Sequence, residues 1–235
     1  MKNTELMLAL DLNDLSEVKH LLTEVSGSVS HFKIGLRLYL KEGNSVIGLI
    51  RNHGKVFLDL KFHDIPNTVY NAVSESVKYG VDFVDVHASG GSEMMTAACK
   101  AVTGTKTKVL GVTVLTSLSD RELYDEVKCT LSVDKMVSSL AQLAKNSGLH
   151  GVVASARELT ALRALLGADF IIATPGIRLS EGGETNDQKR VETPAQAARN
   201  GADYIIVGRP ILESSDKKGI ITKFKDQLKE ANRGF

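Results

Sequence analysis

The sequence has almost no net charge, because its 29 lysines and arginines are balanced by 28 aspartates and glutamates. A formal charge of +1 on 235 residues gives no basic field that would attract nucleic acid or an anionic membrane. We therefore expect neither of these as a partner. Any specificity for an anion has to come from a local site.

Cysteine is also scarce, with only Cys99 and Cys129 in the chain. They form no CxxC motif and have no histidine nearby at ligand spacing, which disfavours a structural zinc site and a disulfide framework. A reducing compartment, the cytoplasm, fits this usage.

Long apolar segments are missing as well. No run reaches the roughly 18 apolar residues of a membrane span, and residues 1–5 lead into a strand-like segment without the apolar core of a secretion signal. These absences predict a soluble protein in which residues 1–235 form a single domain.

Short apolar runs rich in β-branched residues alternate with helix-length amphipathic stretches along the whole chain. This alternation is typical of βαβ units and a parallel sheet. The candidate strands are Leu6–Asp11, His31–Gly35, Val56–Lys61, Phe83–His87, Lys108–Val114, Gly151–Ala154, Asp169–Ala173 and Tyr204–Val207. The candidate helices lie near 14–26, 39–52, 66–79, 91–102, 134–147, 157–166, 193–200 and 215–232.

Eight such units without a linker favour one closed (β/α)8 barrel, the TIM barrel. The alternative is an open doubly wound sheet, but neither GxGxxG nor GxxxxGK[ST] follows the first strand. Residues 115–133 and 174–192 form two long connections, which in a barrel would lie at the C-terminal face where active sites occur.

Polar residues occupy the C-terminal ends of several predicted strands, namely Asp11, Lys33, Asp59, Lys61 and His87. Because side chains alternate along a strand, Asp59 and Lys61 should point to the same side. Charges buried in a barrel mouth are costly unless they are paired. An ion pair that only closes the barrel is one interpretation, and convergence of four charged groups on one cavity favours a functional one.

One segment resembles a family signature. Asp59-Leu60-Lys61-Phe62-His63-Asp64-Ile65-Pro66-Asn67-Thr68-Val69 is similar to the DxKxxDIPxTV motif of orotidine 5′-phosphate decarboxylases, and the likeness extends over essentially the whole chain. Other parts that carry it are Ala9-Leu10-Asp11, Phe32-Lys33-Ile34-Gly35, Val86-His87-Ala88, residues 112–117, Thr174-Pro175-Gly176-Ile177-Arg178 and Val207-Gly208-Arg209-Pro210.

The resemblance implies conversion of OMP into UMP and CO2 without a metal or a cofactor. Lys61 is then the ammonium that protonates C6 of the pyrimidine as CO2 leaves. Lys33, Asp59 and Asp64 complete an alternating array of charges, and the carboxylates keep Lys61 protonated. Whether Asp59 acts by repelling the substrate carboxylate or by positioning Lys61 stays open.

The resemblance also implies a homodimer with shared active sites. The family residues that match Asp64, Ile65 and Thr68 enter the site from the neighbouring subunit. Asp11 and Thr68 match residues that contact the ribose hydroxyls.

The implied phosphate ligands follow strands seven and eight. Gly208 allows close approach of the backbone, Arg209 and Gln188 bind the phosphate, and Arg178 is expected nearby. Residues 179–190, which contain a Gly-Gly pair, are interpreted as a lid, although a merely disordered loop would have the same composition. Arg163, by contrast, is expected to be a solvated surface charge.

The pyrimidine edge is expected to meet residues that follow strand five. Thr116 and Ser117 carry suitable hydroxyl and amide groups, or else they only cap a turn. Pro175 completes the expected substrate-binding set. His87 could line the site or be structural, and His63 should face away from Lys61. No His, Asp or Glu grouping has convincing metal spacing.

Two other functions remain open at this point. A magnesium-dependent sugar-phosphate decarboxylase or synthase of the same barrel superfamily shares the DxKxxD core, but lacks the continuation through Val69. A non-catalytic sensor of phosphate ligands would need only the phosphate site, so the charged array disfavours it.

Overall fold

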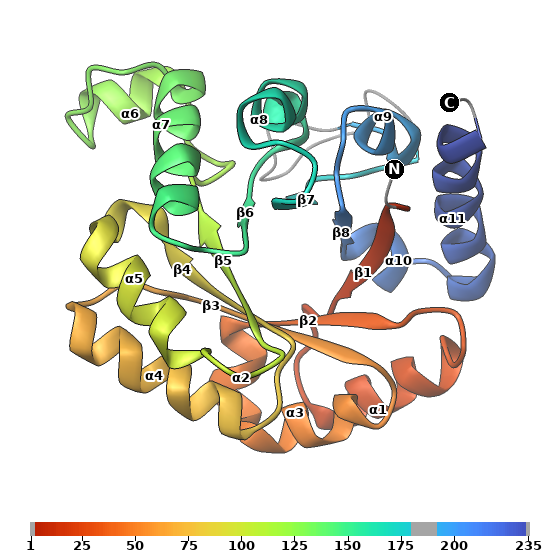
Figure 1. Ribbon diagram of the computed structural model, residues 1–235. Helices are drawn as coiled ribbons and strands as arrows, with labels where there is room; N and C mark the ends of the chain where they lie inside the picture. Colours follow the sequence, from red (N-terminus) through yellow and green to blue (C-terminus); the bar gives the residue numbers. More distant parts are fainter. Residues whose placement is uncertain (1–2, 180–191, 234–235) are drawn as a thin grey trace.

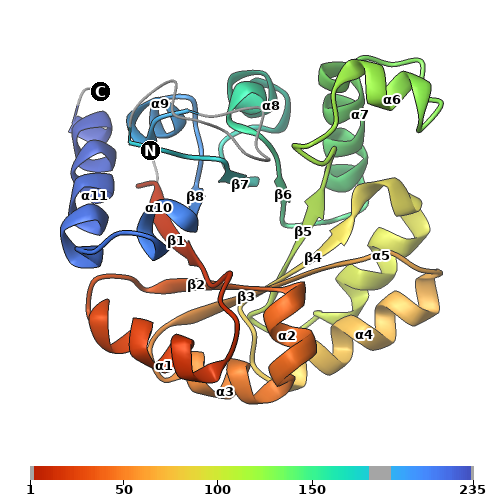
Figure 2. The same ribbon diagram turned by 180° about the vertical axis from the view of Figure 1, so that it is seen from behind.

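The computed structural model of the chain describes residues 3–179 and 192–233. Its strands form a closed parallel barrel in which each strand pairs with the next and β8 pairs with β1. Helices surround this barrel on the outside (Figures 1 and 2). The predicted (β/α)8 barrel is therefore confirmed, and the open doubly wound sheet is wrong.

The strands lie close to their predicted positions. They are β1 (Glu5–Ala9), β2 (His31–Gly35), β3 (Lys55–Phe62), β4 (Phe83–His87), β5 (Lys108–Val112), β6 (Gly151–Val153), β7 (Ile171–Pro175) and β8 (Tyr204–Val207). The α-helices are α1 (Leu15–Glu24), α2 (Leu36–Glu42), α3 (Asn44–Arg51), α4 (Pro66–Lys78), α5 (Gly91–Ala101), α6 (Asp120–Asp125), α7 (Val133–Asn146), α8 (Leu159–Leu166), α9 (Pro194–Arg199), α10 (Arg209–Leu212) and α11 (Lys217–Arg233). Two 3₁₀ turns, η1 (Ala88–Gly90) and η2 (Ala156–Glu158), follow β4 and β6.

The helices differ from the prediction at three places. The single helix expected over 39–52 is two helices, because Gly43 adopts φ 57° and interrupts the hydrogen-bond ladder. The long connection 115–133 contains α6, which begins with a capping box between Ser119 and Glu122. The short helix α10 follows directly after β8.

Apolar residues form two cores, one on each side of the strands. The larger one fills the space between the strands and the outer helices. The smaller one lies inside the barrel and contains Met7, Ala9, Phe57, Phe83, Leu110, Ala173 and Ile206. The inner core fills the barrel below the strands' C-terminal ends, and its members Ala9, Phe57 and Ile206 line a cavity above it.

At the N-terminal end of the barrel, the guanidinium of Arg163 is not solvated as predicted. It makes five hydrogen bonds, to the carbonyls of Gly167, Phe170 and Gly201 and to the Asp203 carboxylate. Asp203 also accepts from the backbone N–H of Ile172 at 2.8 Å. Arg163 thus ties the loops that precede β7 and β8, a role that amphipathic patterning on α8 did not reveal.

Within residues 3–179 and 192–233, no helix combines the length and the apolar composition needed to cross a bilayer.

Candidate active site

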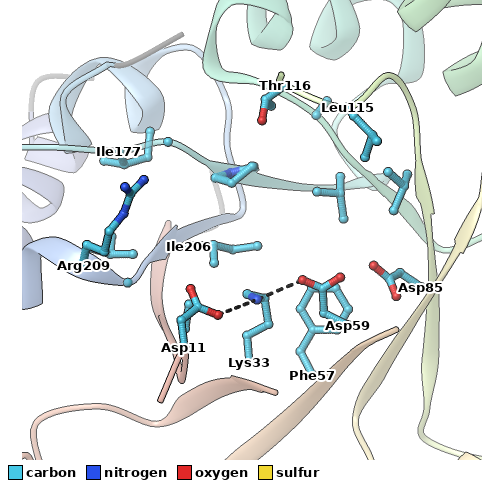
Figure 3. Close-up of a pocket in the computed structure, with 18 of the residues that line it drawn as sticks. Asp11, Lys33, Phe57, Asp59, Asp85, Leu115, Thr116, Ile177, Ile206 and Arg209 are labelled. Atoms are coloured by element: carbon cyan, nitrogen blue, oxygen red, sulfur yellow. Dashed lines mark ion pairs between the residues drawn. The ribbon is translucent and has the colours of Figure 1, made fainter. Parts of the chain in front are cut away.

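A cavity of about 260 Å³ opens at the C-terminal ends of the strands. Its wall is apolar over β5, β6 and β8 and charged over β2, β3 and β4. The residues that line it are Ala9, Asp11, Lys33, Phe57, Asp59, Lys61, Asp85, Val112, Val114, Leu115, Thr116, Val153, Ala154, Pro175, Gly176, Ile177, Arg178, Ile206, Val207, Gly208, Arg209 and Pro210. Figure 3 shows Arg209 and Asp85 at opposite ends of this cavity.

Alternating charges run across the cavity floor (Figure 3). The Lys33 ammonium lies 3.7 Å from Asp11 Oδ1 and 2.9 Å from Asp59 Oδ2. The other oxygen of Asp59, Oδ1, contacts the ammonium of Lys61. Asp59 therefore holds two ammonium groups at once, as expected from the sequence.

The array fixes the ionisation of its members. Burial alone would raise the pKa of Asp59, but the ammonium groups of Lys33 and Lys61 hold the pKa of this carboxyl well below its usual range. Burial would likewise lower the pKa of Lys33, and the carboxylates of Asp59 and Asp11 instead raise it. Asp59 is thus an anion and Lys33 a cation at neutral pH.

Lys61 reaches the cavity by a different route from the regular alternation assumed in the prediction. Its backbone has φ 51°, a left-handed conformation that few residues other than glycine adopt. The β3–β4 pairing shifts register between Leu58 and Phe62. The direction predicted for Lys61 is correct, but a β-bulge produces it.

Asp85, on β4, is a cavity residue that the sequence reasoning missed. It is only 1% exposed, and its Oδ1 accepts a hydrogen bond from the backbone N–H of Lys61 at 2.8 Å. Burial, together with the nearby negative charge of Asp59, raises the pKa of Asp85 well above its usual range. The signal was present, because Asp85 lies two residues after the inward-facing Phe83 and between the apolar Val84 and Val86.

Two glycines leave room for the carboxylate of Asp11. A Cβ at Gly35 would lie 3.4 Å from Asp11 Oδ1, and a Cβ at Gly208 would lie 3.2 Å from Asp11 Oδ2. The position of Gly208 at the end of β8 therefore also keeps the cavity rim open beside Arg209.

The two arginines predicted near a phosphate both line the cavity. Arg178 is held by its backbone N–H, which donates to the carbonyl of Glu192 at 3.0 Å. Its side-chain Nε is buried and, in the described part of the chain, has no hydrogen-bond partner. Thr116 and Pro175 lie on the same wall, whereas Ser117 is not part of the lining.

Three predicted site residues are not brought into this cavity. Asp64, Ile65 and Thr68 lie at the start of α4 with exposed side chains, and Ile65 is 68% exposed. Gln188, and with it most of the expected lid over 179–190, lies outside the described residues.

The two histidines of interest pack together. The rings of His63 and His87 have centroids 5.2 Å apart, and neither residue belongs to the cavity lining. Among residues 3–179 and 192–233, no group of three or more His, Cys, Asp or Glu side chains has the arrangement of a metal site.

A family model described as "Orotidine 5'-phosphate decarboxylase / HUMPS family" matches residues 4–224. The chain belongs to this family. Its predicted membership of the orotidine 5′-phosphate decarboxylase family is thereby confirmed.

Relatives within the family are similar over nearly their full length. An orotidine 5′-phosphate decarboxylase from Fusobacterium nucleatum is 46% identical over 210 residues, which cover 88% of each chain. One from Syntrophotalea carbinolica is 43% identical over 235 residues, covering 97% of this chain and 96% of the relative.

Solved structures agree with this family membership. The crystal structure of orotidine 5′-phosphate decarboxylase from Lactobacillus acidophilus is 37% identical, has a TM-score of 0.85, and covers 97% of this chain and 99% of its own. An uncharacterized conserved protein from Geobacillus kaustophilus has a TM-score of 0.83 at 33% identity.

Proposed function

We propose that the chain is an orotidine 5′-phosphate decarboxylase, a carboxy-lyase that converts OMP into UMP and CO2. The names of similar proteins over nearly the whole chain support this function. The observation that carries it is the Lys61 ammonium held by Asp59 in a cavity whose lining also contains Arg178 and Arg209.

In the proposed reaction the bond between C6 and the carboxylate carbon breaks, and the electron pair stays on C6. Lys61 then donates a proton from Nζ to C6. The Lys33–Asp59–Lys61 array is in place before the substrate binds, so that stabilising the developing carbanion needs little reorganisation. Asp64 is proposed to join this array as a second carboxylate beside Lys61.

The cavity has the polarity that a nucleotide needs. The phosphate is proposed to bind Arg209, Gly208 and Gln188, and a phosphate oxygen would give the buried Nε of Arg178 an acceptor. Asp11 and Thr68 would bind the ribose hydroxyls, and Thr116 and Pro175 the pyrimidine. Because Arg209 and Asp85 lie at opposite ends of the cavity, phosphate and reacting ring can be bound at the same time (Figure 3).

A homodimer is part of the proposal. Asp64, Ile65 and Thr68 follow β3, the strand that contributes Asp59 and Lys61 to the cavity, and their side chains are exposed. Residues that complete a partner's site would be exposed in this way in an isolated chain. Tyr70 on α4 and Leu40 on α2 add further exposed apolar side chains, 41% and 75% exposed. A partner surface over this region would remove them from water.

The decisive assay follows the absorbance change as OMP is consumed, with and without EDTA. Full activity in EDTA is expected, whereas a magnesium-dependent sugar-phosphate enzyme would lose activity. Lys61→Ala should abolish turnover and leave UMP binding largely intact. An unchanged rate in Lys61→Ala would exclude the proposed chemistry, and UMP binding without turnover by the wild type would indicate a sensor.

The shared site can be tested by mixing two inactive variants. Lys61→Ala and Asp64→Ala dimers, dissociated and reassociated together, should regain about a quarter of wild-type activity, because half of the dimers are hybrids with one intact site each. No recovery, or a fully active monomer in sedimentation, would contradict shared sites.

The proposal extends to the domain and its compartment. Residues 1–235 would act as one functional domain in the cytoplasm, and the free thiols of Cys99 and Cys129 would remain reduced there.

A further inference from the structure

Asp85 provides a hydrogen bond at the point where the sheet cannot. On β3, three residues lie between Leu58, which pairs with Val84, and Phe62, which pairs with Val86, while β4 has only Asp85 in this interval. The backbone N–H of Lys61 therefore has no regular partner across the ladder. Asp85 Oδ1 accepts it instead, at 2.8 Å.

This hydrogen bond acts on a backbone that is hard to maintain. Lys61 adopts φ 51°, which costs a residue with a side chain of the order of 1 kcal/mol or more. The bulge also decides where the Lys61 side chain begins, and thus where its ammonium meets Asp59. An acceptor for the Lys61 N–H consequently stabilises the position of the ammonium.

The second oxygen of Asp85 has no donor among the described residues. Oδ2 is buried and receives no hydrogen bond from any donor in the described structure, and the neighbouring side chain is the Asp59 carboxyl, with which Asp85 interacts (Figure 3). Two carboxyl groups can hydrogen-bond only if one of them carries a proton.

The surrounding charges place that proton on Asp85. Asp59 is held as an anion by Lys33 and Lys61, and β5 presents the apolar Leu110 and Val112 to the inside of the barrel. Although Lys61 favours the anion of Asp85, burial and the Asp59 charge outweigh it and raise the pKa of Asp85 well above its usual range.

We infer that Asp85 is a positioning residue, a neutral carboxylic acid that accepts from the Lys61 backbone N–H and donates to the Asp59 carboxylate. It thereby fixes the Lys61 ammonium from two sides without touching the reacting carbon. The effect of Asp85 on turnover rests on the proposed decarboxylase function. The presence of a proton on Asp85 does not depend on that function.

Three variants test the role. Asp85→Ala removes both hydrogen bonds, and Asp85→Asn keeps an acceptor for Lys61 N–H and an N–H donor for Asp59. Asp82→Ala is the matched control, since Asp82 Oδ2 likewise accepts from a β3 backbone N–H, that of Val56 at 2.9 Å, but at the other end of the strands.

The expected result is a separation of kcat from KM. Asp85→Ala should lower kcat for OMP about 10- to 100-fold, the scale of a misplaced reacting group, while KM changes less than about threefold. Asp85→Asn should restore kcat to within about fivefold of wild type, and Asp82→Ala should lower the melting temperature but not kcat. Wild-type kcat in Asp85→Ala, or an Asp85→Asn variant as slow as Asp85→Ala, would overturn the inference.

A stability measurement tests the proton independently of turnover and of Asp85→Ala folding. An unfolded aspartate loses its proton near pH 4, whereas a buried Asp85 keeps it, so the contribution of Asp85 to stability should fall as pH rises above about 4. Asp85→Asn lacks this proton, and its melting temperature should rise relative to wild type between pH 4 and 8. If the difference in melting temperature between Asp85→Asn and wild type stayed constant with pH, Asp85 would not be a neutral acid. A wild type inactive on OMP would refute only the proposed function.

Discussion

The two ends of the barrel both contain buried charges, but they use them differently. At the N-terminal end, the Arg163 guanidinium makes five hydrogen bonds, and its carboxylate partner Asp203 also accepts from a backbone N–H. At the C-terminal end, Asp59 holds two ammonium groups, and Arg178 Nε lacks a partner within the described residues.

This difference separates a charge cluster that supports the fold from one that supports a reaction. Where the bonds close within the protein, removing a member mainly lowers the free energy of unfolding. Where charges crowd together around an open cavity, the protein keeps them for a ligand. Variants at the two ends should therefore fail in different assays.

The largest expected effect is at Asp59. Asp59→Asn removes the anion that holds the ammonium groups of Lys33 and Lys61, and kcat for OMP should fall about 10²- to 10³-fold, as for loss of one preorganised electrostatic group. The absorbance assay at saturating OMP measures this. A decrease of less than about threefold would mean that the charge cluster around Asp59 is structural, like the one around Arg163.

The second effect belongs to the opposite end. Arg163→Ala should lower the free energy of unfolding by about 3 kcal/mol, because it leaves Asp203 without its cation, and kcat of the folded protein should stay unchanged. Urea unfolding measures the first and the absorbance assay the second. Arg199→Ala, an exposed arginine on α9, is the control and should change stability by less than about 0.5 kcal/mol.

A smaller effect is expected at the phosphate end of the cavity. Arg209→Ala should weaken UMP binding by about 2 kcal/mol, or roughly 30-fold, the scale of one charge-assisted hydrogen bond. Uridine lacks the phosphate, so its binding should not change. Calorimetric titration of both ligands checks this, and equal losses for the two would contradict a phosphate contact.

The smallest effect is a pH dependence at His31, whose ring packs against those of Phe83 and Tyr204. Burial lowers the pKa of His31, although Glu5 at 3.3 Å opposes this. Below about pH 6.5 His31 of the unfolded chain binds a proton that the folded one does not, so the contribution of His31 to stability falls as pH decreases. Between pH 7.5 and 5.5, the melting temperature of the His31→Phe variant should decrease less than that of wild type. An identical decrease would show that His31 does not cause the pH dependence.

Much of the fold could be predicted because its signals are local and periodic. The inward and outward alternation of strands such as β2 and the cap residues of helices such as α9 require no knowledge of distant contacts. The split at Gly43 and the helix α6 were missed, since a continuous apolar pattern hides a glycine break and a long connection hides a short helix.

The candidate site shows the same division. Asp11, Lys33, Asp59 and Lys61 were found because each stands near the end of a strand and matches a known motif. Asp85 was missed because it lies inside its strand, outside any motif, and its partner is a backbone N–H exposed only by the bulge in β3. The assigned roles of these residues, and those of Asp64, Ile65, Thr68 and Gln188, stay predictions.

The left-handed backbone at Lys61 implies a conflict between folding and chemistry at a single position. Judged by φ alone, glycine would suit residue 61 better than lysine, because only a side chain brings steric strain there. A screen that selects for thermal stability alone should thus tend to discard the amine first. To stabilise this protein and keep its activity, Lys61 has to be retained and stabilising substitutions have to be sought at other positions.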